Sequence, residues 1–438
     1  MSSSASPRTA VAAWLFAVVV LLVALSIAFP AYPQWITGVI AWGACLLLLP
    51  GLPRRQLIMS LVLVVLGVAG IVWGMASGKQ GLVSIALAQN IPLTGLLIAV
   101  SFLQLIAVRA DTATEPLRVG PNALGKTLLG VHLFGAVINF SAVAIFADRL
   151  SAYRKLTLQQ AMALSQGFII GATWSPFYGA MAAALTVSPS ASLVQLMAWG
   201  FLLAMVGLTI TWFTLTSKRH GEAKDFIGYP LHFESLWVPA VLAASVLAVH
   251  EWQPRWSVLA VIATLAPLVT IVTLFARDPL AAIPTLRQHV NRRLPLMNGE
   301  LTLFMSAGVL SAGMSGAIHA LDLGLPFTRF GPFEAGIVLV IMNVCAWIGL
   351  HPVILVSVIG PWLLPLDPDP NMLAMVFMMS WGVGLTACPT SNTMLVMAGR
   401  YGLPFGRMLN ENRRYSLMMT AVCIAGLYAY AAVKDIAW

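Results

Sequence analysis

Two stretches of the sequence place proline, glycine and hydroxyl side chains inside otherwise apolar runs. The first begins at Gly171 and reads G-A-T-W-S-P, and the second begins at Gly384 and reads G-L-T-A-C-P-T-S-N-T. Proline lacks a backbone donor and clashes with the preceding turn, so each stretch predicts an interrupted helix. An interruption frees amides at one half-helix end, where anions bind, and carbonyls at the other, where cations bind.

These interruptions supply the candidate binding residues. We predict that a small anionic substrate binds the polar groups of the two breaks: Thr173, Trp174, Ser175, Thr386, Ser391, Asn392 and Thr393. We predict ion ligands next to the breaks and at two sharp turns: Asn139, Ser141, Pro176, Gly349, His351 and Pro389. A coupling sodium ion fits such carbonyls, hydroxyls and amides better than a proton does, because no carboxylate lies in the middle of an apolar run. We expect no catalytic residues, no metal site and no organic cofactor.

Each of these features also has a purely structural interpretation. Proline kinks are common in membrane helices, hydroxyls often bond back to their own helix, and Asn139 could bond only a neighbouring helix. His132 and His351, the histidines deepest in apolar runs, fit packed, hydrogen-bonded residues better than a proton relay. Two interruptions at corresponding places of the chain nevertheless favour binding, because secondary transporters bind their substrates there.

The overall composition predicts a membrane protein. Of 438 residues, 59% are hydrophobic and 9% are charged, against roughly a quarter charged in soluble domains. Apolar runs recur along the whole chain and predict an all-α polytopic protein of about eleven spans. The predicted spans are 10–29, 35–51, 57–76, 82–107, 157–187, 191–216, 235–250, 256–275, 299–319, 371–399 and 414–434. The first run is longer than the core of a signal peptide, so we expect a retained span.

Two further apolar stretches, 127–148 and 335–364, either cross the membrane or turn back as re-entrant hairpins. If both turn back, all but four of the 24 Lys and Arg residues face one side, the exceptions being Lys79, Arg255, Arg329 and Lys434. If both cross, the basic residues divide evenly. Because basic loops stay in the cytoplasm, we predict two hairpins. Their turns fall at 139–141 and 349–352, with the N-terminus cytoplasmic and the C-terminus outside the inner membrane.

A shift along the chain superimposes the two interrupted helices. It pairs Gly171 with Gly384, and the threonine and proline of the first break with those of the second. One hairpin precedes each copy, and the two enter from opposite sides, so the sequence predicts an inverted repeat. The predicted domains are an extra N-terminal span (1–34), a first repeat (35–216) with broken helix 157–187, a cytoplasmic linker (217–234), and a second repeat (235–438) with broken helix 371–399.

With these features the chain resembles the divalent anion–sodium symporters of the ion transporter superfamily. The resemblance rests on the eleven-span plan, the two oppositely entering hairpins, the Thr–Pro pattern at both breaks and the triplet Ser391-Asn392-Thr393. In that family the triplet marks both hairpin turns, whereas here it occurs once and in a broken helix. The membrane subunits of tripartite acid transporters and the arsenite permeases are therefore equally compatible. The resemblance implies an elevator-type carrier of carboxylates or oxyanions with a separate, dimer-forming scaffold.

The predicted function is a cation-coupled secondary transporter of a small organic anion or oxyanion. We expect contacts with membrane lipid and a homodimer, leave a partner subunit open, and exclude nucleic acid because the basic residues lie in short loops. The alternative is a membrane-embedded enzyme or lipid-handling protein of envelope synthesis, which would use the loops 217–235 and 277–298. Neither loop contains a recognisable catalytic set, and the chain has no Walker, H-E-x-x-H or G-x-S-x-G motif. Small residues in 306–313 predict close helix packing.

Overall fold

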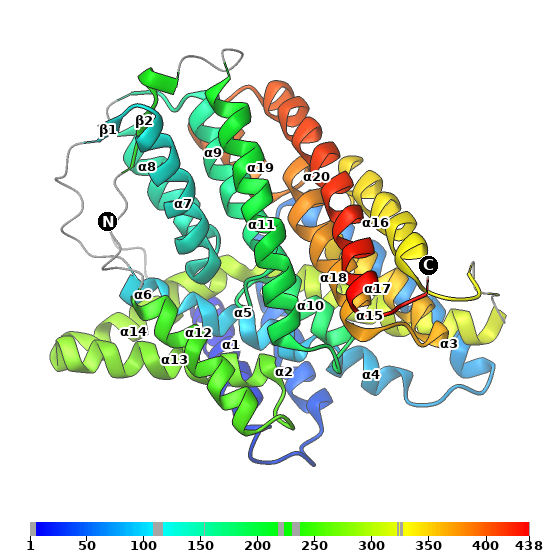
Figure 1. Ribbon diagram of the computed structural model, residues 1–438. Coiled ribbons are helices and arrows are strands. Elements are labelled where there is room, and N and C mark those ends of the chain that lie inside the picture. Colours follow the sequence, from blue (N-terminus) through cyan, green and yellow to red (C-terminus); the bar gives the residue numbers. More distant parts are fainter. Residues whose placement is uncertain are drawn as a thin grey trace. The chain divides into compact units, whose positions relative to one another are not determined.

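The computed structural model describes residues 6–107, 117–152, 154–217, 223–229, 237–321, 324 and 327–437. Apart from one short antiparallel pair, β1 (Arg118–Val119) with β2 (Ile227–Gly228), the regular structure of these residues is helical (Figure 1). By length and composition, nine helices of the described chain can cross a membrane, and three shorter apolar helices accompany them. The prediction of an all-α polytopic membrane protein is confirmed.

The chain forms two compact units, each assembled from separate stretches of the sequence. The first unit contains residues 1–106, 242–326 and 356–365, and the second contains residues 107–241, 327–355 and 366–438. Each unit therefore takes helices from both predicted repeats. The repeats and their boundaries therefore stay a prediction from the sequence. The two units describe instead which helices pack together in the structure.

The first unit is built mainly from helices that precede the second hairpin. They are α1 (Pro7–Leu25), α2 (Gln34–Leu48), α3 (Arg54–Ala76), α4 (Leu82–Ala88), α5 (Ile91–Ser101), most of α6 (Gln104–Ala107), α13 (Val258–Arg277), α14 (Pro279–Arg293) and α15 (Asn298–Leu321), counted among the described residues. Most of α12 (Trp237–Trp252) and of α17 (Pro352–Leu363) also belongs to it. Short 3₁₀ turns follow at Leu49–Gly51, Leu294–Met297 and Leu364–Leu366.

Small residues allow α3 to pack directly on α15 in the first unit. A Cβ added at Gly313 would overlap the carbonyl oxygen of Gly67, and one added at Gly70 would overlap that of Gly313. At the end of α3, Lys79 donates from Nζ to the carbonyl and the hydroxyl of Ser315, at 2.9 and 2.8 Å. The close packing predicted for the small residues of 306–313 is confirmed at Gly313.

The second unit holds both predicted interruptions. Its helices are α7 (Pro121–Ile138), α8 (Phe140–Ser151), α9 (Leu158–Ile169), α10 (Gly179–Val187), α11 (Leu193–Thr216), α16 (Pro332–Trp347), α18 (Pro370–Met379), α19 (Asn392–Tyr401) and α20 (Phe405–Val433). The 3₁₀ turns Ile170–Thr173, Ala223–Asp225 and Leu385–Ala387 and the π-helical turn Ser380–Gly384 complete it. β1 and β2 also lie in this unit.

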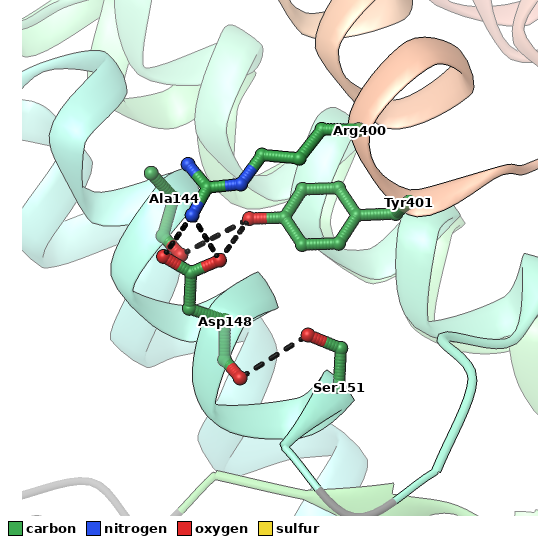
Figure 2. A network of polar contacts seen from close by, with 5 residues as sticks. All are labelled: Ala144, Asp148, Ser151, Arg400 and Tyr401. Carbon is green, nitrogen blue, oxygen red and sulfur yellow. Dashed lines mark hydrogen bonds and ion pairs between the residues drawn. The ribbon is translucent and has the colours of Figure 1, made fainter.

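One end of the second unit gathers the termini of α8 and α19, and we call it the Asp148 end. Figure 2 shows Arg400 and Tyr401 of α19 converging on Asp148 of α8. The Arg400 guanidinium contacts the carboxylate at 2.9 Å, and the Tyr401 hydroxyl donates to it at 2.6 Å. The strand pair belongs to the same end, because Phe146 of α8 stacks on Tyr229, just beyond β2, with ring centroids 4.4 Å apart.

The opposite end of the second unit, which we call the Tyr430 end, gathers four other loops. Tyr430 of α20 donates to Asp369 at 3.0 Å, just before α18, and Ser188 after α10 donates to the carbonyl of Pro370 at 2.9 Å. Gly331, just before α16, lies against the carbonyl of Ala437. Among the described basic residues of this unit, Arg329 and Lys434 belong to these loops, and the side of the membrane on which they lie stays a prediction.

Two helical hairpins begin and end at opposite ends of this unit. The pair α7–α8 starts beside the strand pair and finishes at Asp148, so it begins and ends at the Asp148 end. The stretch from Gly331 to Asp369 begins and ends at the Tyr430 end. Its turn lies between α16 and α17. Re-entrance is defined relative to a bilayer and stays a prediction.

Cysteines placed at Ser151 and Asn410 are expected to share one labelling behaviour in intact cells, whereas a cysteine at Ser190 behaves oppositely. Ser151 ends α8 and bonds the Asp148 carbonyl, and Asn410 lies near the start of α20, which follows α19 after a short loop. Ser190 lies in a loop of the Tyr430 end. A membrane-impermeant maleimide, applied before and after lysis, measures the accessibility. Opposite accessibility of the first two positions would contradict both the hairpin and the charge-based sidedness.

Candidate functional site

The first predicted interruption is a helix break in the structure. The 3₁₀ turn after α9 ends at Thr173, and α10 begins at Gly179, so residues 174–178 leave the helix. The Ser175 hydroxyl donates to the carbonyl of Ala136 in α7 and accepts a hydrogen bond from the Phe177 amide at 3.2 Å. The break is therefore anchored on the first hairpin, three residues before its turn at Asn139.

Two glycines bring neighbouring helices into contact with this break. The Thr173 hydroxyl donates to the carbonyl of Gly200 in α11 at 3.0 Å, and a Cβ added at Gly200 would overlap the Thr173 carbonyl oxygen. A Cβ added at Gly382, in the π-helical turn, would lie 2.7 Å from Thr173 Cγ2. The break of the first half thus packs directly on the interrupted helix of the second half.

His132 links the first hairpin to the break through both of its ring nitrogens. Nδ1 lies 2.9 Å from the carbonyl of Gly167, and Nε2 accepts from the Trp174 indole at 3.1 Å. Since Nε2 accepts and Nδ1 must donate, the ring is the neutral Nδ1–H tautomer. His132 is fully buried, and this geometry fits the packed, hydrogen-bonded interpretation of the residue.

The second predicted interruption is also a helix break, and it touches the second hairpin. After α18 the chain forms the π-helical turn and a 3₁₀ turn, leaves the helix at 388–391 and resumes as α19. π-helical turns of this kind recur at functional sites. The Thr390 hydroxyl donates to the carbonyl of Gly349 at 3.0 Å, and Gly349 forms the hairpin turn with φ of 109°. Each hairpin therefore meets the break of its own half.

Four helices begin at these turns and breaks. They are α8 after Asn139, α10 after Tyr178, α17 after His351 and α19 after Ser391. Each N-terminus carries a partial positive charge from its unpaired amides. α10 runs from the first break toward the Tyr430 end, and α19 runs from the second break toward the Asp148 end. The positive N-termini of both helices therefore lie inside the unit, and the two helices point in opposite directions. The segments that precede the breaks end in carbonyls without helical partners.

The predicted substrate residues differ sharply in burial. Five of the seven are almost fully buried, namely Thr173 (2% exposed), Ser175 (0%), Thr386 (0%), Ser391 (1%) and Thr393 (3%). The Thr386 hydroxyl donates to the Gly382 carbonyl at 3.0 Å, and Ser391 caps α19 through the Met394 amide at 3.3 Å, so both support the local backbone. Trp174 is partly exposed, and its indole N–H donates to His132. Asn392 is exposed, and its side chain makes no hydrogen bond to a described residue.

The predicted ion ligands divide between the two hairpin turns and the two breaks. Asn139 adopts φ of 56° and accepts the Phe140 amide at 2.9 Å, and Ser141 follows it in α8. Pro176 lies buried in the first break, and Pro389 lies half-buried in the second. The backbone at Gly349 receives Thr390, and His351 packs edge-on against Trp381 with ring centroids 5.1 Å apart.

Sequence reasoning missed a line of polar residues on α20 that faces the second break. Asn412 accepts from Gln166 of α9 at 3.1 Å, Ser416 donates to the carbonyl of Val383 at 3.0 Å, and Thr420 accepts from Asn343 of α16 at 2.8 Å. Arg413 belongs to the same stretch of α20. The available signal was the spacing 412, 416 and 420, which places three polar residues on one face of the helix.

The helices, hairpins and breaks define an integral, all-α polytopic membrane protein. The chain matches no protein-family model, and no curated protein matches its sequence. Its structure is similar to that of the YdaH transporter of Alcanivorax borkumensis, with 16% sequence identity over 98% of this chain and 98% of that one, and a TM-score of 0.39. A likeness of that size establishes neither a family nor a function for this chain.

Proposed function

We propose that this protein is a secondary active transporter that moves a small organic anion or an oxyanion across the inner membrane with a coupled cation. The observation that carries the proposal is that each hairpin meets the helix break of its own half. Ser175 donates to the carbonyl of Ala136, and Thr390 donates to that of Gly349 at 3.0 Å. Irregular backbone at membrane depth persists only where protein packs around it or a cavity needs it. Secondary transporters bind their substrates at such discontinuous helices.

The proposed anion site uses the amide ends of the interrupted helices. α10 and α19 begin at the two breaks, and α19 begins with Asn392, whose exposed side-chain amide has no partner among the described residues. A helix N-terminus favours negative charge, and an amide side chain adds a neutral donor. Asn392 is therefore the proposed substrate contact within the Ser391–Thr393 triplet. The buried hydroxyls of Thr173, Ser175 and Thr386 hold the breaks in shape.

The proposed cation sites use the carbonyl ends that precede the turns. α7 ends before Asn139 and α16 ends before Gly349, so each hairpin leaves carbonyls without helical partners next to a break. Asn139 holds a positive φ that residues other than glycine rarely adopt. Such conformations cluster at functional sites. Sodium is the proposed ion, because carbonyl, hydroxyl and amide oxygens are its ligands in this class of transporter.

The second unit is the proposed carrier, since it holds both breaks and both hairpin turns. An elevator movement of this unit and a homodimer formed through the first unit extend the same proposal. The alternative of an envelope-synthesis enzyme would use the loops 217–235 and 277–298. Residues 279–293 form α14, and the described part of the other loop contributes β2. No group of three or more His, Cys, Asp or Glu among the described residues could hold a metal, and no observation favours this second function.

Uptake into proteoliposomes is expected to follow an imposed sodium gradient and to stay constant from about pH 6 to about pH 8. Carbonyls, hydroxyls and amides do not titrate in that window, whereas a free imidazole titrates at about 6.5. Labelled mono- and dicarboxylates and oxyanions, supplied with sodium or with potassium, give the measurement. Empty vesicles are the control. Uptake that ignores sodium, follows an imposed pH gradient and fails in His351→Gln would replace sodium coupling by proton coupling.

A further inference from the structure

Arg413 is a half-buried arginine on α20 that has no carboxylate partner among the described residues. Its Nη2 donates to the carbonyl of Trp347 at 3.2 Å, and its Nε is enclosed without a hydrogen bond to any residue that the structure describes. The nearest acid along the helix, Glu411, pairs with Arg414 at 3.0 Å. Arg400, near the end of α19, pairs with Asp148.

The guanidinium of Arg413 lies beside the turn of the second hairpin. Trp347 is the last residue of α16, two positions before Gly349, whose carbonyl receives Thr390 of the second break. The Trp347 indole donates to Ser416 at 3.0 Å, about one helical turn along α20 from Arg413. Arg413 and Ser416 of α20 thus both hydrogen-bond Trp347, one through its carbonyl and the other through its indole. These two contacts attach α20 to the second hairpin next to its turn.

Arg413 also lies at the level where α19 begins. It lies about 12 Å along α20 from Phe405, and Asn392 lies about 13 Å along α19 from Tyr401, by the rise of a helix. The neighbouring Asn412 donates to the sulfur of Met394, in the first turn of α19, at 3.3 Å. The positive end of α19 and the charge of Arg413 therefore act on one region of the unit.

A half-buried charge without a counter-charge costs part of its hydration energy, and an arginine cannot escape this cost by losing its proton. Inside a membrane, such a residue is paired or serves a function. One of the five N–H donors of Arg413 is used by Trp347, and the terminal nitrogen Nη1 has no partner among the described residues. The planar fork of a guanidinium matches a carboxylate through two parallel hydrogen bonds. The guanidinium of Arg413 therefore lacks an anionic partner among the described residues.

We propose that Arg413 binds the carboxylate of the transported substrate, next to the N-terminus of α19. This inference rests on the transport function proposed above and narrows it to solutes that carry a carboxylate. The hydrogen bond to Trp347 orients the guanidinium against the hairpin turn. The accessible terminal N–H groups bind the substrate.

The variants Arg413→Gln and Arg413→Lys test this inference against Arg407→Gln, which removes an exposed arginine from the same helix. Arg413→Gln is expected to raise KM for carboxylates by about 10- to 100-fold, the effect of losing a hydrogen bond to a charged group. Arg413→Lys keeps the charge but loses the fork, so a smaller rise is expected. Arg407→Gln is expected to keep the wild-type KM. Thermal stabilisation by added carboxylate should disappear with Arg413→Gln, which a merely structural arginine would not cause.

Three outcomes would overturn the inference. The first is a wild-type KM in Arg413→Lys, which decides the matter if Arg413→Gln does not fold. The second is equal competition, in the wild-type protein, by a carboxylate substrate and its carboxamide analogue. The third is an effect of Arg413→Gln that occurs in phosphatidylglycerol vesicles and vanishes in phosphatidylcholine vesicles, because the ligand would then be a lipid phosphate. Failure of the wild-type protein to take up or be stabilised by any anion would instead refute the transport function itself.

Discussion

Uptake by the Asn392→Ala variant is expected to fall to the level of empty vesicles, while the purified variant keeps the thermal stability of the wild-type protein. Asn392 is exposed at the first position of α19, and its side chain makes no hydrogen bond to a described residue. Removing it therefore leaves no buried group unsatisfied, and alanine is the better helix former. Uptake is expected to fall because Asn392→Ala removes a side chain that binds the substrate beside the N-terminus of α19.

Asn410→Ala and Ser391→Ala are the matched controls for this variant. Asn410 is also an exposed asparagine, at the Asp148 end, and its replacement is expected to leave uptake and stability unchanged. Ser391 caps α19, so Ser391→Ala is expected to lower the free energy of unfolding by about 0.5–2 kcal/mol, the usual loss for a cap. Full uptake by Asn392→Ala of every substrate that the wild-type protein carries would refute the assignment of the site to the second break.

Gly200→Ala is expected to destabilise the second unit by about 3 kcal/mol or more, because overpacking against backbone forces a helix to move. A Cβ at this position would overlap the Thr173 carbonyl oxygen, and the hydrogen bond from the Thr173 hydroxyl to the Gly200 carbonyl would stretch from its 3.0 Å. The strain falls on the first helix break. Thermal unfolding in detergent, together with size-exclusion profiles, measures the loss.

Gly399→Ala is the control for the glycine substitution. Gly399 lies in α19, and a Cβ added there meets no atom within 4 Å. Alanine in a helix interior is about 0.8–1 kcal/mol more favourable than glycine, so this variant is expected to be slightly more stable than the wild-type protein. Equal stability of Gly200→Ala and Gly399→Ala would mean that α11 does not pack on the first break.

Local physical chemistry explains why the sequence predicted the helix breaks and the hairpin turns. Pro176 and Pro389 each lack a backbone donor and clash with the preceding turn, which disfavours a continuous helix, and the structure leaves the helix at both. The turn predicted at 349–352 contains a glycine that takes φ of 109°. Composition likewise predicted the membrane class, because apolar content does not depend on which helices meet.

Element boundaries were less predictable where a distant residue decides them. The span predicted at 82–107 divides into α4, α5 and α6. At the first division Asn90 donates to the carbonyl of Phe304 at 2.7 Å, and Gln89 donates to Ser311 at 2.7 Å. Hydrophobic periodicity contains no information about such partners on α15. The helix predicted at 414–434 begins earlier, at Phe405, directly after its N-cap residue Pro404.

By itself the sequence determined that this is a polytopic helical membrane protein, where its helices break, and that two hairpins accompany the breaks. Only the tertiary structure decided which helices form each unit and what each polar side chain does. It assigned the Thr386 and Ser391 hydroxyls to their own backbone, left Asn392 without a partner among the described residues, and brought Arg413 to the hairpin turn at Trp347. Breaks follow from the conformational preferences of single residues, which act locally. The partner of a side chain is instead chosen by packing between segments far apart in the chain, and one sequence without its fold does not contain those distances.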